Sequence, residues 1–484
     1  MVNLVLEGIS GMDPEEMVKV RDLVRVYNQH LAANAKKQRY YDGHVSLAEV
    51  NLGIALPEAL ANLSINCEWG AKCVDVLASR SMFDGFVGKN GEDADAIKDI
   101  ADRNNIVSEY MKACRDELKF GCAFATLSSG EDGCRVRFHS PESAAAIWDG
   151  EKGRISRGLA IIAYEEDSLG QEWPSVINYY TDDAIWVLRA AEKSQRFVAE
   201  RHPHRMGRPL MEPLIWNPTS AKPFGRSRLK APIRSLIQGY VRTIANATIG
   251  LEFSTTPQKY LLGITDEQYD AVINQKFRQY IGNILAATNN PETGENPVFG
   301  QLSQGSLEPH VQMMRLLATQ FSAASGLTVT DVGVVNDANP TSSDAILAQS
   351  QTLVLMAEQL NAGNTQALIT IARMAQAVER NVSLEDLTEA ERDIIPHFMN
   401  PAMPSVSVTA DAAIKIASAR QTFAETDTFL EMIGFGQADI RRIKAQEQRA
   451  RGQAVLTEEF GNADNYEGLG EIYRPADSSE SGSS

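Results

Sequence analysis

The chain has 484 residues, a formal net charge of −17 and a sequence pI of about 5.0. This length predicts roughly three domains, and 43% hydrophobic with 23% charged residues is typical of a globular protein rather than a membrane protein. The acidic balance is the reverse of the basic surface expected of a protein that holds nucleic acid by its phosphates. The first residues lack the basic and long apolar segments of a secretory signal, so we expect the chain to stay in the cytosol.

Helical and strand patterns alternate over about the first 215 residues and predict an α+β unit. Asp13 as the N-cap, Pro14 at the first helical position and Glu16 open an amphipathic helix over 13–34. The runs CAFATL and CRVRFH, separated by the turn-rich SSGEDG, predict a hairpin. The remaining elements are helices predicted over 68–82, 94–105 and 107–119 and strands predicted within 158–166, 175–189 and 195–202.

Two long helices follow, separated by a small insertion. The connector WNPTSAKPFGRSR leads into a helix over 229–252, and the second long helix covers 309–325. The insertion spans 257–308, where the patterns predict a short helix over 265–279 and strands in NILAAT and PVFGQL. We therefore expect a small α/β element between the two helices.

The C-terminal third is predicted to be helical. Thr341 and Asp344 form a capping-box pattern that starts a helix through 360. Gly363 and Asn364 are expected to interrupt this helix, with another continuing to 380. The last predicted segments are a helix over 409–432, a basic helix that includes 441–451, where Ile440 and Ile443 are the apolar anchors, and a disordered acidic tail over 457–484.

Charge is sorted along the chain. Between 213 and 251 there is no acid, whereas between 284 and 347 several acids face the single cation Arg315. The acid-free stretch carries Lys222, Arg226, Arg228, Lys230, Arg234 and Arg242. The helix over 309–325 has a polar stripe at spacing 3, 4, 3, made by Gln312, Arg315, Thr319 and Ser322.

No motif in the sequence indicates an enzyme. A phosphate-binding G-x-x-x-x-G-K-[ST] loop is absent, and GFGQAD follows a helix instead of a strand, so neither an ATPase nor a dinucleotide-binding fold is indicated. His202 and His204 lack further ligands at metal-binding spacing, and Ser227 fits a helix N-terminus. The odd number of cysteines, without a C-x-x-C pair, indicates reduced core residues: Cys67, Cys73, Cys114, Cys122 and Cys134. We expect no catalytic, cofactor or metal site.

Several blocks of the sequence, taken in order, are similar to a known family. The chain contains YYDGH, NCEWGAKCVDVLASRSMFDGF, ACRDELKFGCAFATL, FGRSRLKAPIRSLIQGYVRT, QKYLLG, SGLTVTDVGVVNDANPTSSDAILAQSQTLV and MPSVSVTADA. Together they resemble the portal proteins of tailed bacteriophages, the head-to-tail connector rings, from about Tyr40 to Ala450. The resemblance implies an α+β, portal-type fold with an α/β wing, two long stem helices, a small α/β clip insertion and a helical crown.

The resemblance also implies a division into segments and a function. The segments would be a wing over 1–221 and 346–408, stem helices in 222–256 and 309–325, a clip over 257–308, a tunnel loop over 326–345, a crown over 409–456 and the acidic tail. The function would be a homo-oligomeric ring of about twelve subunits at one capsid vertex. Double-stranded DNA would pass through this ring during packaging and ejection, without sequence specificity.

The implied partners are the terminase large subunit, a head-tail adaptor and the major capsid protein, with a scaffold protein as a further candidate. No cofactor and no membrane are implied. We expect the protein in the virion, at the portal vertex, and in the host cytoplasm during assembly. The alternatives are another structural protein of the virion head and a metal-dependent nucleic-acid-processing enzyme.

A channel for sliding DNA should confine the phosphates without binding them, because each phosphate that is neutralised strengthens nonspecific binding. The segment 326–345 contains neither Lys nor Arg, and Gly326, Gly333 and Asn339-Pro340 permit unusual backbone conformations. An ordinary surface loop between two helices is the alternative for this segment. We expect the channel to be lined by Gln312, Arg315, Thr319, Ser322, Val334, Val335, Asn336 and Asp337.

The basic segments would then lie away from the channel lining. The stretch from Lys222 to Arg242 would lie on the outer stem and meet an acidic capsid or motor surface, with a solvated helix face as the alternative. The cations from Arg441 to Arg451 would contact packaged DNA or pair between subunits.

Overall fold

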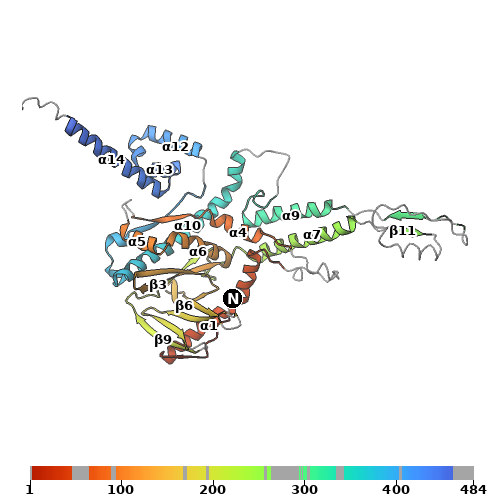
Figure 1. Cartoon of the computed structure of the whole chain (residues 1–484), viewed down its shortest axis with the longest axis horizontal. Helices are drawn as coiled ribbons and strands as arrows, with labels where there is room; N and C mark the ends of the chain where they lie inside the picture. The colour runs from red at the N-terminus through yellow and green to blue at the C-terminus, as the bar shows by residue number, and fades with distance from the viewer. Residues whose placement is uncertain are drawn as a thin grey trace, which may run out of the picture. The chain divides into compact units, whose positions relative to one another are not determined.

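The chain forms two compact units, Met1–Pro401 and Ala402–Ser484, which are described separately (Figure 1). The computed structural model describes residues 3–45, 65–88, 94–166, 170, 172–191, 196–255, 259–262, 294, 296, 298–301, 306–333, 343–402 and 406–461. Within these ranges no helix combines the length and the apolar character that a bilayer crossing requires.

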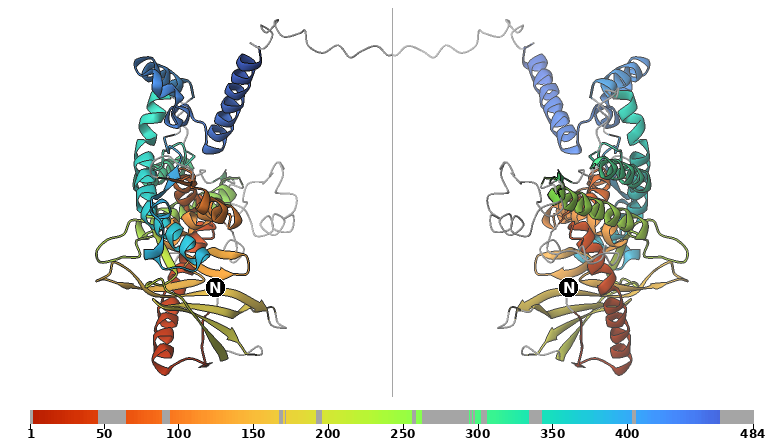
Figure 2. Two further views of the ribbon diagram at one scale, coloured as in Figure 1. Left: turned by 90° about the vertical axis from the view of Figure 1, so that its left-hand side faces the viewer. Right: turned by 90° about the vertical axis from the view of Figure 1, so that its right-hand side faces the viewer.

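The first unit contains a six-stranded sheet covered by one long helix. In spatial order its strands are β1 (Gly8–Ser10), β9 (Arg196–Pro203), β8 (Ala184–Ala190), β7 (Glu172–Tyr180), β6 (Arg154–Glu166) and β5 (Ala144–Asp149). Only β1 pairs in parallel; the other neighbours are antiparallel. Helix α1 (Pro14–Tyr41) buries Val20, Leu23 and Tyr27 against this sheet and continues beyond its predicted end at 34 (Figure 2).

A second layer of the first unit combines short sheets with helices. The sheets are β10 (Met211–Ile215), β3 (Cys122–Gly130) and β4 (Gly133–His139), and β13 (Ile394–Phe398) with β2 (Phe83–Gly88). The hairpin predicted from CAFATL and CRVRFH is confirmed as β3 and β4. The helices predicted nearby are confirmed as α4 (Trp69–Ala78), α5 (Asp95–Arg103) and α6 (Ile106–Phe120). All five cysteines are buried and form no disulfide, which confirms their interpretation as reduced core residues.

Two helices of the first unit, α7 (Ala231–Thr255) and α9 (Glu308–Ser325), run side by side (Figure 1). Between them in the chain, β11 (Lys259–Leu262) pairs antiparallel with β12 (Val298–Gln301). The strand predicted in PVFGQL is confirmed, whereas β11 was not predicted. The helix predicted over 265–279 and the strand predicted in NILAAT lie outside the described residues.

Helix α10 (Ser343–Arg380) is one element of 38 residues, so the predicted break at Gly363 and Asn364 is wrong. Asn364 is fully buried, and its Nδ2 donates to Glu117 Oε2 at 2.8 Å and to the Tyr110 hydroxyl at 3.1 Å. These tertiary contacts outweigh the weak helix propensity of Gly-Asn. Helix α10 packs on β3, β4, β10 and β13. The unit ends with a 3-10 turn (Leu384–Asp386), α11 (Glu389–Arg392) and β13.

The second unit is helical and differs from its predicted boundaries. The prediction of a single helix over 409–432 is wrong. Helix α12 (Val406–Ala419) ends before a 3-10 turn (Gln421–Glu425), and α13 (Asp427–Ile433) follows it. The second helix begins at Asp427 because the Thr426 side chain caps it by accepting from the Phe429 amide. Helix α14 (Gln437–Gly461) passes the predicted start of disorder at 457. Its expected anchor Ile440 is buried, which confirms that part of the prediction. The tail from 462 lies outside the described residues.

Candidate functional site

Helices α7 and α9 pack closely because small residues lie at their contact. A Cβ atom at Gly239 of α7 would lie 3.3 Å from the side chain of Leu317, so glycine permits the approach of the two helices. On α7, Ile233, Ile237 and Val241 are buried at a spacing of four residues. The two helices therefore form one rigid pair with a shared apolar core.

Aromatic contacts fasten this pair to the rest of the first unit. The ring centroid of Trp69, on α4, lies 4.1 Å from that of Tyr240 on α7 and 4.7 Å from that of Phe321 on α9. Trp69 and Phe321 are buried, and such tilted aromatic packing stabilises an interface beyond its buried area. One side chain of α4 thus holds both helices.

A buried arginine ties the C-terminal end of α9 to two other helices. Arg228 is only 7% exposed. Its Nε donates to the carbonyl of Cys73 at 2.6 Å, one terminal nitrogen donates to the carbonyl of Ser325 at 2.6 Å, and the other lies 3.3 Å from Met356 Sδ. Carbonyl groups in the last turn of a helix lack partners within the helix, and positive charge is favourable there. Arg228 therefore joins α4, α9 and α10.

The predicted polar stripe on α9 is exposed except at its last member. Gln312, Arg315 and Thr319 are exposed. The Gln312 amide donates to Glu308 Oε1 at 3.2 Å, and the Thr319 hydroxyl donates to the carbonyl of Arg315 at 2.9 Å. Ser322 is buried, and its hydroxyl donates to the carbonyl of Leu327 at 2.7 Å. The Ser322 side chain therefore faces the interior of the first unit, whereas the other three are exposed.

The first part of the loop after α9 folds onto the first unit. Gly326 ends the helix in the left-handed conformation, with φ of 73°. The amide and hydroxyl of Thr328 donate to Asp331 Oδ2 at 3.0 and 2.7 Å, and Lys72 Nζ donates to the carbonyl of Asp331 at 2.8 Å. The buried side chains of this part are Leu327 and Val332. The predicted lining residues Val334, Val335, Asn336 and Asp337 lie outside the described residues.

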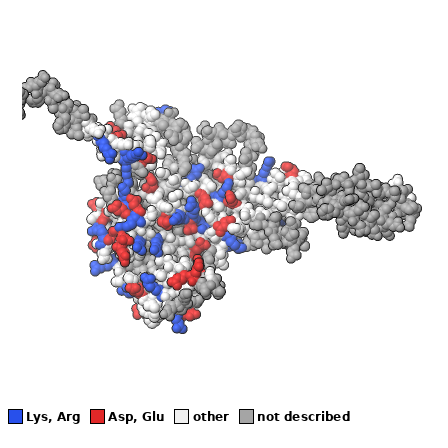
Figure 3. Space-filling model, in the orientation of Figure 1, with Lys and Arg blue, Asp and Glu red and all other residues white. Residues whose placement is uncertain are grey.

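Positive charge is missing from a much longer stretch than the loop. From 316 to 372, a run of 57 residues, the sequence contains no Lys and no Arg. The run covers the end of α9, the loop and more than half of α10. In Figure 3 charged side chains of both signs are mixed over the body of the first unit, whereas the described part of α7 and α9 is largely uncharged.

One known family matches most of the chain. The model of the family described as "Phage portal protein, SPP1 Gp6-like" matches residues 23–453. The chain belongs to this phage portal family. A phage portal protein forms a ring at one capsid vertex, and this is the role that the family gives to the chain.

Solved structures similar to this portal chain come from gene transfer agent (GTA) particles. They are the virion of the native particle (TM-score 0.43, 11% identity, 72% of this chain and 84% of that chain), the neck of the empty particle computed with C6 symmetry (0.45, 11%, 73% and 85%) and the neck of the native particle computed with C12 symmetry (0.43, 11%, 76% and 89%). No curated protein matches the sequence.

The cations of the basic stretch in this portal chain occupy different environments in the fold, which the sequence did not indicate. Arg228 is buried among carbonyl groups, as described above. Four others, Lys222, Arg226, Lys230 and Arg234, line a pocket between α1, β5 and the start of α7. The sequence signal that was available is the clustering of these cations without any acid.

The histidines near the end of β9 do not gather metal ligands. His202 Nε2 lies 3.6 Å from Glu200 Oε1, and burial lowers the pKa of His204 below its usual value. Across the part of the chain that the structure describes, there is no group of three or more His, Cys, Asp or Glu side chains that could hold a metal ion. Ser227 accepts from the Leu229 amide at 2.9 Å, but α7 begins at Ala231, so Ser227 lies in the connector and is not at the helix N-terminus that the sequence indicated.

Proposed function

We propose that the exposed face of α9 and the loop that follows it line the channel through which duplex DNA passes during packaging and ejection. The observation that carries the proposal is the cation-free run from 316 to 372, which starts directly after Arg315 on an exposed helix face. The chain is placed in a ring by its family, and a closed ring of about twelve copies repeats this face around one axis.

The physical reason is the salt-dependent attraction between cations and phosphates. Each phosphate that a protein neutralises changes the logarithm of the binding constant by about −0.9 per logarithm of salt concentration. A lysine on every subunit, repeated around the ring, would therefore hold the duplex tightly and resist its movement. A lining of neutral side chains with one Arg315 per subunit leaves the duplex hydrated and able to slide.

The residues proposed for the lining follow from their exposure. Gln312, Arg315 and Thr319 are exposed on one helix and are retained, whereas Ser322 is left out because its hydroxyl is buried. Val334, Val335, Asn336 and Asp337 remain predictions. They continue the chain from the anchored segment 326–333.

The other segments are proposed to have the roles that the family suggests. The wing would comprise 1–221 and 346–408, the stem 222–256 and 309–325, the tunnel loop 326–345, and the crown 409–456. The clip over 257–308 would dock the terminase large subunit and later the head-tail adaptor. Contacts with the major capsid protein and with a scaffold protein would form in the host cytoplasm during assembly, before the ring becomes part of the virion.

The lining is tested by adding one lysine per subunit at two places. Thr319→Lys adds the charge on the proposed lining, and Gln29→Lys adds it at an exposed position of α1, outside the cation-free run, as the matched control. We expect Thr319→Lys to shorten the packaged DNA and to steepen the salt dependence of DNA binding by purified rings. Val335→Lys should act in the same direction.

Two outcomes would contradict the proposal. If Thr319→Lys and Gln29→Lys package DNA of the same length and bind DNA with the same salt slope, α9 does not line the channel. If negative-stain microscopy of the purified protein shows no ring with a central hole, the chain acts as a different structural protein of the virion head. A divalent-metal-dependent nuclease assay separates both from a nucleic-acid-processing enzyme.

A further inference from the structure

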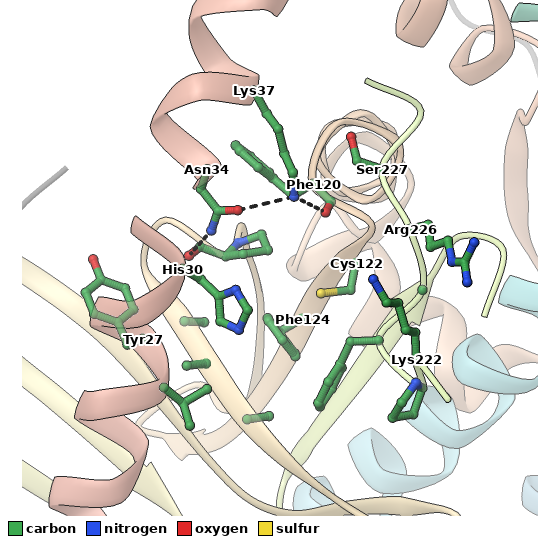
Figure 4. A pocket seen from close by; sticks show the side chains of 18 of the residues that line it. Tyr27, His30, Asn34, Lys37, Phe120, Cys122, Phe124, Lys222, Arg226 and Ser227 are labelled. Carbon is green, nitrogen blue, oxygen red and sulfur yellow. Dashed lines mark hydrogen bonds between the residues drawn. The ribbon is translucent and has the colours of Figure 1, made fainter. Parts of the chain in front are cut away.

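A pocket of about 630 Å³ lies in the first unit, and none of the residues that line it comes from α9 (Figure 4). It is bounded by α1, by β3 and β5, and by the connector and first turn of α7. Its floor is apolar and is formed by Phe120, Phe124, Phe224 and the three consecutive alanines Ala144, Ala145 and Ala146. The small alanine side chains leave the space that a larger residue at these positions would fill.

Five cations surround this floor. They are Lys37 from α1, Lys222 and Arg226 from the connector, Lys230 from the residues between the connector and α7, and Arg234 from α7. Among the described residues that line the pocket there is no Asp or Glu. In the described part of the chain none of the five has a carboxylate partner, although the protein as a whole carries a net charge of −17.

The cations are close enough to act on one another. Burial lowers the pKa of Lys37 below its usual value, and the charges of Arg234 and Lys222 lower it further. Burial and the charge of Lys37 also lower the pKa of His30. Lys37 is held in place, since its Nζ donates to the carbonyl of Phe120 at 2.8 Å and to Asn34 Oδ1 at 3.4 Å (Figure 4). An anion in the pocket would relieve this mutual repulsion.

The connector that carries Lys222 and Arg226 is held by its own hydrogen bonds. The Arg226 amide donates to the carbonyl of Trp216, and the Trp216 amide donates to the carbonyl of Gly121, both at 3.0 Å. Gly225 has a φ of 69°, and a Cβ atom there would lie 2.2 Å from the carbonyl oxygen of Trp216. Because the loop is ordered by its own hydrogen bonds, binding loses little conformational entropy in ordering it.

We propose that this pocket is a docking site for an acidic peptide segment of a partner protein, with an aromatic or aliphatic side chain on the apolar floor and carboxylates on the surrounding cations. Such a segment would contact both the apolar floor and the cations around it. The backbone of duplex DNA presents phosphates without an apolar side chain to occupy the floor, so the alanines and phenylalanines favour a peptide. The proposal does not depend on which residues line the DNA channel.

The test uses the full-length protein and a fluorescein-labelled synthetic peptide in which glutamates flank one phenylalanine. Binding is followed by fluorescence anisotropy at low ionic strength. The test variant combines Lys222→Glu with Arg226→Glu, and the matched control combines Arg21→Glu with Lys98→Glu; all four side chains are exposed. We expect the test variant to bind about tenfold more weakly, which corresponds to about 1.4 kcal/mol, while the control retains the affinity of the original protein.

Further binding experiments distinguish the contribution of the apolar floor from that of the cations. Replacing the phenylalanine of the peptide by serine should weaken binding without any change in the protein. Equal affinity of the test and control variants, or no binding of the glutamate peptide, overturns the proposal. If a thymidine oligonucleotide of equal charge binds as tightly and is equally sensitive to Lys222→Glu with Arg226→Glu, the pocket is a nucleic-acid site and the peptide assignment is wrong.

Discussion

Replacement of Glu117 by glutamine should change how stability depends on pH. Glu117 lies in a buried polar cluster on α6, where Oε2 accepts from Asn364, and Oε1 has no partner within the described residues. In the same cluster, the Ser81 hydroxyl donates to Asn361 Oδ1 at 2.6 Å and lies 2.9 Å from the Tyr110 hydroxyl. Burial raises the pKa of Glu117 from 4.5 to about 8, against the opposing effect of the Asn364 hydrogen bond.

The direction of the effect follows from proton binding in the two states. Between pH 4.5 and about 8 the folded protein keeps the proton on Glu117, whereas the unfolded chain has lost it. The stability contributed by the protonated side chain is complete below the lower value and is lost as the pH rises toward the higher one. Each pH unit well inside this window costs about 1.4 kcal/mol, and the slope decreases close to pH 8 because Glu117 begins to lose its proton in the folded protein as well. The change from pH 6 to pH 8 therefore costs about 2.3 kcal/mol. Glutamine does not titrate and avoids this loss.

The assay is thermal unfolding of the original protein and the Glu117→Gln variant at pH 6 and pH 8, at equal protein concentration. Glu117 belongs to the unit Met1–Pro401, and at an unfolding entropy of about 2.1 cal/mol/K per residue the variant should gain roughly 3 °C in Tm over the original protein between these two pH values. Glu131→Gln, an exposed carboxylate beside β4, is the control and should leave the pH dependence unchanged. Parallel pH curves for the original protein and Glu117→Gln would refute the reasoning, because they would mean that Glu117 releases its proton at the same pH in both states.

Two further predictions concern Arg228 and Gly225, which hold neighbouring segments of the first unit together. In Arg228→Lys the lysine cannot reach all the acceptors of the guanidinium, so the carbonyl of Ser325 should lose its partner at a cost of about 1–3 kcal/mol. Faster hydrogen exchange of the backbone amides over 326–333 would check this, and unchanged exchange would contradict it. Gly225→Ala should lower Tm well beyond Gly207→Ala, because both residues have positive φ but only at Gly225 would the Cβ meet the carbonyl of Trp216. Equal losses would show that backbone strain alone accounts for the effect.

The order of the elements could be predicted from the sequence, because it rests on local patterns. The hairpin formed by β3 and β4, the helices α4 to α6 and the long helices α7 and α9 all follow from periodicity and turn residues. The break expected at Gly363 and Asn364 was wrong because helix propensity is weak compared with the buried hydrogen bonds of Asn364. Those bonds join residues about 250 positions apart, and no local pattern records them.

The candidate site was predictable only where exposure follows from helix periodicity. Gln312, Arg315 and Thr319 satisfy the expected exposed stripe, but Ser322 does not, since the chain turns at Gly326 and brings the carbonyl of Leu327 over its hydroxyl. Arg228 has the same sequence surroundings as the exposed cations on either side of it. Its burial depends on carbonyl groups from α4 and α9, which only the folded chain brings together.

The unbroken course of α10 has a mechanical consequence. A helix of 38 residues is roughly 57 Å long at 1.5 Å per residue, and the buried side chain of Asn364 fixes its middle, where a hinge would otherwise form. A displacement applied near Ser343 therefore cannot be absorbed by bending at Gly363. We expect such a displacement to be passed along the helix to the strands on which it packs, β3, β4, β10 and β13.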